Sequence, residues 1–117
     1  MNQNKIRGIL GLSKKAGRLI TGTDLVLDAV RSGKRMPCLV LLAEDASANT
    51  TKKVQNCCGH YGAQLINLPL SGEDLAKCTG KTGVIALAAI TDEGFAKALL
   101  ALLSTKSEFM EQREDNE

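Results

Sequence analysis

The chain has 117 residues, 44% hydrophobic and 24% charged, which is typical of one globular domain with a real core. Its four cysteines form no C-x-x-C pair and it has a single histidine, so the sequence predicts neither a metal site nor a cofactor. The net charge is only +2, but residues 1–35 carry a net +6 and residues 106–117 a net −3. This asymmetry predicts a polyanion partner for the first third, although solvated helix faces would explain the same charges.

The apolar runs are too short to cross a bilayer. The longest, residues 38–43 and 84–90, fall far below the roughly 20 residues of a membrane-spanning helix. No apolar stretch follows the first five residues, as it would in an export signal. We therefore expect a cytoplasmic protein without a membrane partner, in which the four thiols are free and buried.

Predicted helices alternate with predicted strands along the chain. The helices are residues 4–16, 23–31, 49–61, a short helix from Ser71 to before Gly80, and one from about residue 91; the strands are residues 19–20, 38–43, 64–68 and 84–90. Residues 38–43 and 84–90 are continuously apolar, like strands buried on both faces. The pattern predicts an α/β fold: a three-layer α/β/α sandwich with a small central mixed sheet, forming one domain over residues 1–104. We expect residues 105–117 to be an acidic, disordered tail.

Local signals support several of these elements. Val54, Cys57, Cys58 and Tyr61 form a helical stripe that predicts a buried face. Ser71 and Asp74 have the spacing of a capping box. The acidic pairs, each at or before a predicted helix start, are explained by capping; they are Glu44-Asp45, Glu73-Asp74 and Asp92-Glu93.

Enzymatic chemistry finds little support in the sequence. Gly80-Lys81-Thr82 has the ending of a Walker A motif, but Leu75 stands where that motif needs glycine, and a helix rather than a strand precedes it. His60 lies beside the buried stripe of its helix, as a structural histidine would, and no G-x-S-x-G elbow is present. A small nucleotide-handling enzyme is therefore the weakest hypothesis, and we expect no catalytic residues.

The stretch from residue 17 to residue 30 carries the clearest functional signal. A short strand runs through Thr21 and Gly22 into a helix that starts at Thr23, with Lys14, Lys15 and Arg18 just before it. Such a helix start offers free backbone N–H groups and the positive end of the helix dipole, which bind phosphate. Aromatic residues make up only 3% of the chain, which argues against a base-stacking platform. Binding of RNA would therefore use shape, backbone contacts and apolar packing on splayed bases.

Six fragments occur in an order that is shared with a known family. They are Gly22-Thr23-Asp24-Leu25, Arg31-Ser32-Gly33-Lys34, residues 41–47, Thr51-Lys52-Lys53, residues 75–80 and residues 91–96. Through them, residues 4 to 103 resemble the kink-turn RNA-binding ribosomal protein family and its small bacterial YlxQ-like branch. The resemblance implies the same α/β/α sandwich and a non-enzymatic protein that clamps a kink-turn or similarly bent RNA. The implied partners are structured RNA such as ribosomal RNA, and the ribosome or the translation or transcription machinery; we expect a monomer when free.

The resemblance also implies three groups of RNA-binding residues. The turn into the second helix would enter the groove through Thr21, Gly22, Thr23, Asp24 and Leu25. Lys15, Arg18, Lys34 and Arg35 would lie near phosphates. The loop of Lys81, Thr82, Gly83 and Val84 would pack on an extruded base.

Some positions depart from the family pattern. Well-known members have Asn-Glu in place of Asp24-Leu25 and lysine in place of Thr21 and Asp28. A carboxylate accepts hydrogen bonds from base amino groups but cannot supply the second bond of an amide. The alternative function is therefore a protein-interaction adaptor that keeps the fold and has lost kink-turn recognition.

Overall fold

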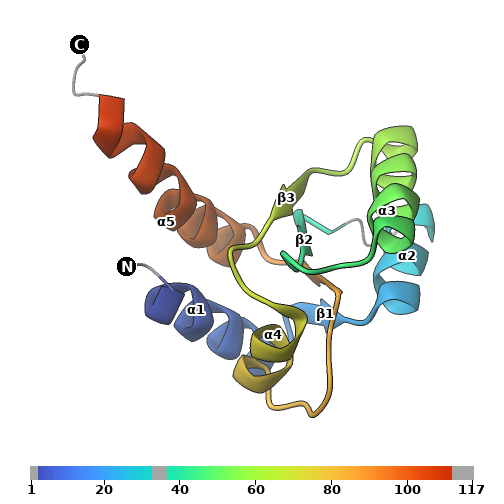
Figure 1. The fold of residues 1–117 in the computed structure, drawn as a ribbon, viewed down its shortest axis with the longest axis horizontal. Helices are drawn as coiled ribbons and strands as arrows, with labels where there is room; N and C mark the ends of the chain where they lie inside the picture. The colour runs from blue at the N-terminus through green and yellow to red at the C-terminus, as the bar shows by residue number, and fades with distance from the viewer. Residues whose placement is uncertain (1–2, 33–36, 112–117) are drawn as a thin grey trace.

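The computed structural model describes residues 3–32 and 37–111. The five helices in this part of the chain are α1 (Gln3–Lys15), α2 (Thr23–Ser32), α3 (Ala48–Tyr61), α4 (Gly72–Cys78) and α5 (Glu93–Glu111). The four strands are β1 (Leu19–Thr21), β2 (Leu39–Leu42), β3 (Leu65–Asn67) and β4 (Leu87–Ile90). These elements alternate in the predicted order (Figure 1).

The strands form one mixed sheet with the order β1-β4-β2-β3. Strand β4 is antiparallel to β1 and to β2, whereas β2 and β3 are parallel. It follows that β1, β2 and β3 all run in one direction. Their last residues and the first residue of β4 therefore lie at the same side of the sheet, which we call the carboxyl edge; the opposite side is the amino edge.

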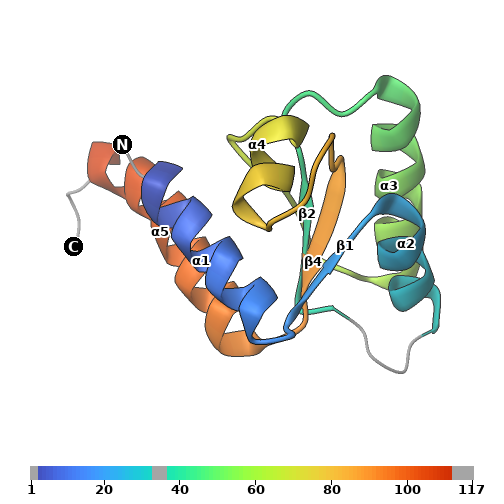
Figure 2. The ribbon, with the colours of Figure 1, turned by 90° about the horizontal axis from the view of Figure 1, so that it is seen from below.

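Helices cover both faces of the sheet, which confirms the predicted three-layer sandwich (Figure 2). Leu39 and Leu41 of β2 belong to one buried cluster with residues of α1, α4 and α5. Val40 and Leu42, which alternate with them, belong to a second cluster with α2 and α3. All four side chains are at most 3% exposed, as expected of a central strand that is buried on both faces.

The helix ends follow the predicted capping chemistry. The Ser71 side chain accepts a hydrogen bond from the Asp74 backbone N–H at 3.1 Å, so one arm of the expected capping box is present. Gly62 closes α3 in the left-handed conformation with φ +74°, where a residue without Cβ has no steric penalty.

Strand β4 is shorter than the apolar run predicts. The run starts at Val84, but the strand starts at Leu87. Gly83 turns the chain with φ +86°, and the Ile85 N–H then donates to the Gly72 carbonyl of α4 instead of to a neighbouring strand. Val84 is 70% exposed for the same reason, so the first part of the run belongs to a loop.

Two predictions of burial are wrong. Tyr61 is the last residue of α3 and is 42% exposed, with its ring edge-on to His60, while Val54, Cys57 and Cys58 of the same stripe are buried. The cysteines are free, but Cys38, just before β2, is exposed, and Cys78 is only half-buried.

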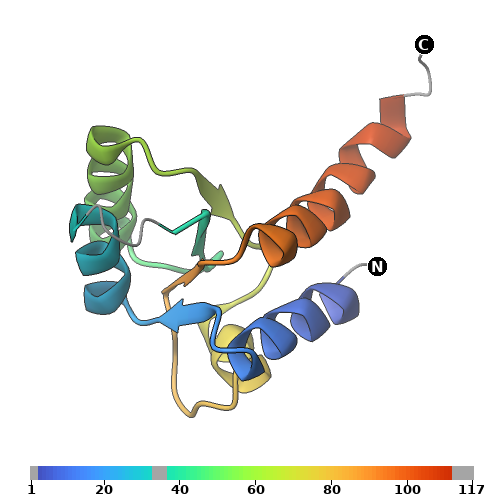
Figure 3. The same cartoon turned by 180° about the vertical axis from the view of Figure 1, so that it is seen from behind.

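Helix α5 reaches Glu111 and so enters the segment assigned to the acidic tail. Figures 1 and 3 show its end projecting beyond the other elements. Residues 112–117 lie outside the described residues, so the disordered tail stays a prediction. No helix in the described part of the chain has the length and apolar character to cross a membrane.

Candidate nucleic-acid interface

The junction between β1 and α2 lies at the carboxyl edge. Thr21 ends the strand and is buried, and Gly22 follows with φ +106°, a conformation that side-chain-bearing residues rarely adopt. The Gly22 N–H donates to the Leu87 carbonyl at 2.9 Å, and its own carbonyl accepts from the Val26 N–H at 3.1 Å. A Cβ at Gly22 would have no atom within 4 Å, so this stretch of backbone faces open space.

The first turn of α2 divides its side chains between solvent and core. Asp24 and Leu25 are exposed, Leu25 by 63%, while Val26 and Leu27 are buried against the sheet. The first N–H groups of a helix have no partner within the helix, and the helix dipole makes this end positive. This turn therefore offers backbone donors, one carboxylate and one apolar side chain to a ligand.

A second exposed segment reaches the same edge. Lys81, Thr82, Gly83 and Val84 are all exposed and connect α4 to β4. Val84 lies three residues before Leu87, so these two residues are at most about 10 Å apart. The Leu87 carbonyl in turn accepts the hydrogen bond from the Gly22 N–H. Figure 2 shows the loop and the start of α2 leading to the same end of the sheet. The structure therefore brings together the two central groups of predicted site residues.

The predicted basic residues lie elsewhere. Lys15 ends α1 and Arg18 precedes β1, so both belong to the amino edge, where the Arg18 carbonyl accepts from the Thr91 N–H at 2.9 Å. Strand β1 separates Arg18 from Gly22 by about 13 Å, at roughly 3.3 Å per residue. The structure therefore does not join them to the β1–α2 junction. Lys34 and Arg35 lie outside the described residues.

Comparison with known proteins identifies the family of this chain. The model of the ribosomal protein L7Ae/L30e/S12e/Gadd45 family matches residues 4–100. The chain belongs to this family. The finding confirms the resemblance that the ordered fragments indicated.

Two curated members resemble the chain over most of its length. A protein of Bacillus subtilis, named "RNA-binding protein YlxQ", is 39% identical over 95 residues, which are 81% of this chain and 91% of that protein. A protein of Enterococcus faecium with the same name is 34% identical over 102 residues, 87% of this chain and 94% of its own.

Two solved structures share the fold of this chain. A Bacillus halodurans protein of unknown function superposes with a TM-score of 0.75 and 32% identity, over 86% of this chain and 97% of its own. A 15.5 kD RNA-binding protein of Giardia lamblia superposes with a TM-score of 0.68 and 16% identity, over 85% and 82% of the two chains. At 16% identity, the second match supports only a shared fold.

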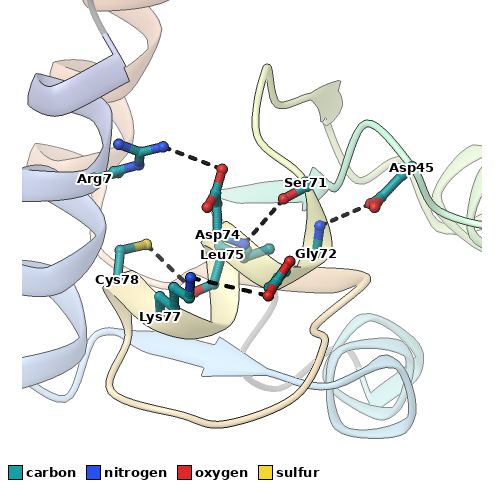
Figure 4. A network of polar contacts seen from close by, with 9 residues as sticks. Arg7, Asp45, Ser71, Gly72, Asp74, Leu75, Lys77 and Cys78 are labelled. Atoms are coloured by element: carbon teal, nitrogen blue, oxygen red, sulfur yellow. Dashed lines mark hydrogen bonds and ion pairs between the residues drawn. The ribbon is translucent and has the colours of Figure 1, made fainter.

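Asp45 is a further polar residue at the carboxyl edge, where it follows β2. Its place before α3 predicts a cap of that helix, but α3 is capped by Ser47, whose side chain accepts from the Thr50 N–H at 3.1 Å. Asp45 instead accepts from the backbone N–H of Gly72, the first residue of α4, at 2.8 Å (Figure 4). The available signal was its place at the carboxyl end of a buried strand, where α/β sheets gather functional groups.

The thiols of Cys58 and Cys78 are poorly suited to act as nucleophiles. Burial raises the pKa of the Cys58 thiol, and burial also raises the pKa of Cys78 despite the opposing charge of Arg7. Both thiols are therefore protonated and poorly nucleophilic at neutral pH. The described residues contain no group of three His, Cys, Asp or Glu side chains that could hold a metal ion.

Proposed function

We propose that this chain is a non-enzymatic RNA-binding protein that recognises a kink-turn or similarly bent structured RNA. The observation that carries the proposal is that Gly22, with open space beside its Cα at the start of α2, shares the carboxyl edge with the exposed apolar side chains of Leu25 and Val84. Backbone donors beside exposed apolar groups fit unstacked bases and the nearby phosphates. The names of the two curated relatives support RNA as the ligand.

Each part of the carboxyl edge has a chemical role in this proposal. The free N–H groups of Thr23 and its neighbours donate to phosphate or base oxygens, and the Asp24 carboxylate accepts from the amino group of guanine or cytosine. Thr21 shapes the turn from β1 into α2. Leu25 and Val84 pack on bases that leave the stack.

The loop and the amino edge would supply the positive charge. Lys81 beside Thr82 and Gly83 would contact phosphates next to the extruded base. Lys15 and Arg18 would reach phosphates of another part of the bent RNA, about one strand length away. We assign the same role to Lys34 and Arg35 from the sequence. In the cytoplasm, a monomer of the chain would bind a kink-turn of ribosomal RNA or an RNA of the translation or transcription machinery.

The test is a titration of the protein into a short fluorescent kink-turn RNA at two salt concentrations, beside a straight duplex of matching composition. We expect tight, salt-sensitive binding to the kinked RNA only. Equal and weak binding to both RNAs would show that the chain keeps a basic surface without recognising the kink. Capture of a protein partner that survives nuclease treatment would then favour the adaptor function, for which exposed Asp24, Leu25 and Asp28 are the candidate surface.

A further inference from the structure

Gly72, the first residue of α4, is held from two sides through its backbone. Its N–H donates to the Asp45 carboxylate at 2.8 Å, and its carbonyl accepts from the Ile85 N–H at 3.0 Å. Asp45 belongs to the segment after β2, and Ile85 to the segment that enters β4. Gly72 therefore links two connecting segments at the carboxyl edge; Figure 4 shows its contact with Asp45.

Gly72 also packs against the exposed side chain of Val84. A Cβ added at this position would overlap the Cγ1 atom of Val84 and would come within 3.0 Å of the Ile85 carbonyl oxygen. One flank of Val84 thus rests on the bare Cα of Gly72, although the side chain is 70% exposed. The glycine is required for this close approach, because any larger residue would displace Val84.

The neighbouring backbone fixes this arrangement to the sheet. The Ala43 N–H donates to the Ala86 carbonyl at 2.9 Å, and the Glu44 N–H donates to the Leu70 carbonyl at 2.9 Å. These bonds fix the residues on either side of α4 and its following loop, while residues 81–84 of that loop are exposed. The first residue of this loop is held by the Lys81 N–H, which donates to the Ala76 carbonyl at 2.8 Å, and its last residue packs against Gly72.

We propose that Asp45 and Gly72 are positioning residues that hold the loop of residues 81–84 in its binding conformation. Asp45 fixes Gly72, and Gly72 fixes Val84 and Ile85. A loop that is ordered before binding avoids the entropy cost of being ordered by its ligand. The effect on RNA affinity rests on the proposed function, whereas the effect on the loop does not.

The free protein provides the first test, by amide hydrogen exchange. We expect Asp45→Ala to speed exchange of the Ile85 N–H about tenfold, as expected when a charged hydrogen bond is lost, and to leave the Leu41 N–H of the central strand unchanged. Gly72→Ala should do the same by displacing Val84. Asp45→Asn should restore slow exchange, because an amide oxygen also accepts from the Gly72 N–H. Unchanged Ile85 exchange in Asp45→Ala and Gly72→Ala would overturn the proposal.

RNA affinity provides the second test, as a double-mutant cycle with Val84→Ala. Asp45→Ala should weaken kink-turn binding about tenfold in the natural chain and have little effect when Val84 is already alanine. The control is Glu44→Ala, which removes the same charge from the adjacent exposed residue and should not weaken binding. Equal losses in both backgrounds would show that Asp45 acts by another route. If no variant binds RNA, the proposed function fails while the exchange result still decides the role of Asp45 and Gly72.

Discussion

The backbone N–H of Gly22 donates a hydrogen bond of 2.9 Å to the carbonyl oxygen of Leu87, and so joins the start of α2 to the start of β4. The same two segments carry the exposed apolar side chains of Leu25 and Val84. Parts of the interface that are far apart in the sequence are thereby held at one edge of the sheet. A ligand could contact the helix start and the loop at once without first bringing them together.

Replacement of Gly22 by valine should weaken RNA binding more than it weakens the fold. A β-branched residue at φ +106° costs about 1–3 kcal/mol of strain, and its bulk would cover the backbone that faces the ligand. Gly62→Val is the matched control, because Gly62 also has a positive φ and open space but closes α3 at the amino edge. Urea unfolding should show similar losses for both variants, and the RNA titration should show a loss only for Gly22→Val. Equal affinity of the two variants would remove Gly22 from the interface.

Replacement of Leu25 or Val84 by serine should lower affinity without lowering stability. Both side chains are mostly exposed, so the free energy of unfolding should change by no more than about 0.5 kcal/mol. Each variant should bind RNA about five- to tenfold more weakly, because apolar contact with a splayed base is lost. Leu12→Ser on α1 is the control, since Leu12 is 60% exposed and lies outside the proposed interface. A loss as large for Leu12→Ser would mean that the effect is not specific to this edge.

The fold could be predicted because its signals are local and periodic. The continuous apolar run of β2 indicates a strand buried on both faces, and the glycine after Tyr61 indicates a helix end. The length of β4 could not be predicted, since Val84 and Ile85 have the composition of a strand. What excludes them is tertiary: the Ile85 N–H bonds to α4, and Gly83 turns the chain before it.

The arrangement of the candidate site residues could be predicted only in part. The turn at Gly22 and the exposed loop with Gly83 lie at one edge because β1 pairs antiparallel with β4, a pairing between distant parts of the chain. The place of Arg18 at the opposite edge follows from strand direction, which composition does not reveal. The contact of Asp45 is a hydrogen bond to a residue 27 positions away, which a local capping pattern does not reveal.

Removal of the basic side chains should change the salt dependence of RNA binding. Each lost phosphate contact lowers the slope of log affinity against log salt by about one. Lys81→Ala tests the carboxyl edge, and the Lys15→Ala, Arg18→Ala double variant tests the amino edge, where the slope should fall by about two. Lys5→Ala is the control, because it also removes a lysine charge from α1, about 15 Å from Lys15 along the helix at 1.5 Å per residue. An unchanged slope for the double variant would exclude phosphate contact by Lys15 and Arg18.

The four thiols should differ in reactivity according to their environment. Iodoacetamide at pH 8 should modify exposed Cys38 at least about tenfold faster than buried Cys57 and Cys58. Burial raises the pKa of the Cys58 thiol above its ordinary value, so less thiolate is present in the folded protein than in the unfolded chain at the same pH.

The same shift gives a pH dependence of stability. Above about pH 9 the folded protein retains the Cys58 proton that the unfolded chain has lost, so the free energy of unfolding should fall as the pH rises.

Peptide mass spectrometry after brief alkylation with iodoacetamide gives the order in which the thiols are modified, and Cys38→Ser should abolish the fast phase. Modification of Cys58 as fast as Cys38 would mean that the face of the sheet covered by α2 and α3 opens readily. In that case the packing that orients the first turn of α2 would be too loose to present Leu25 in one position.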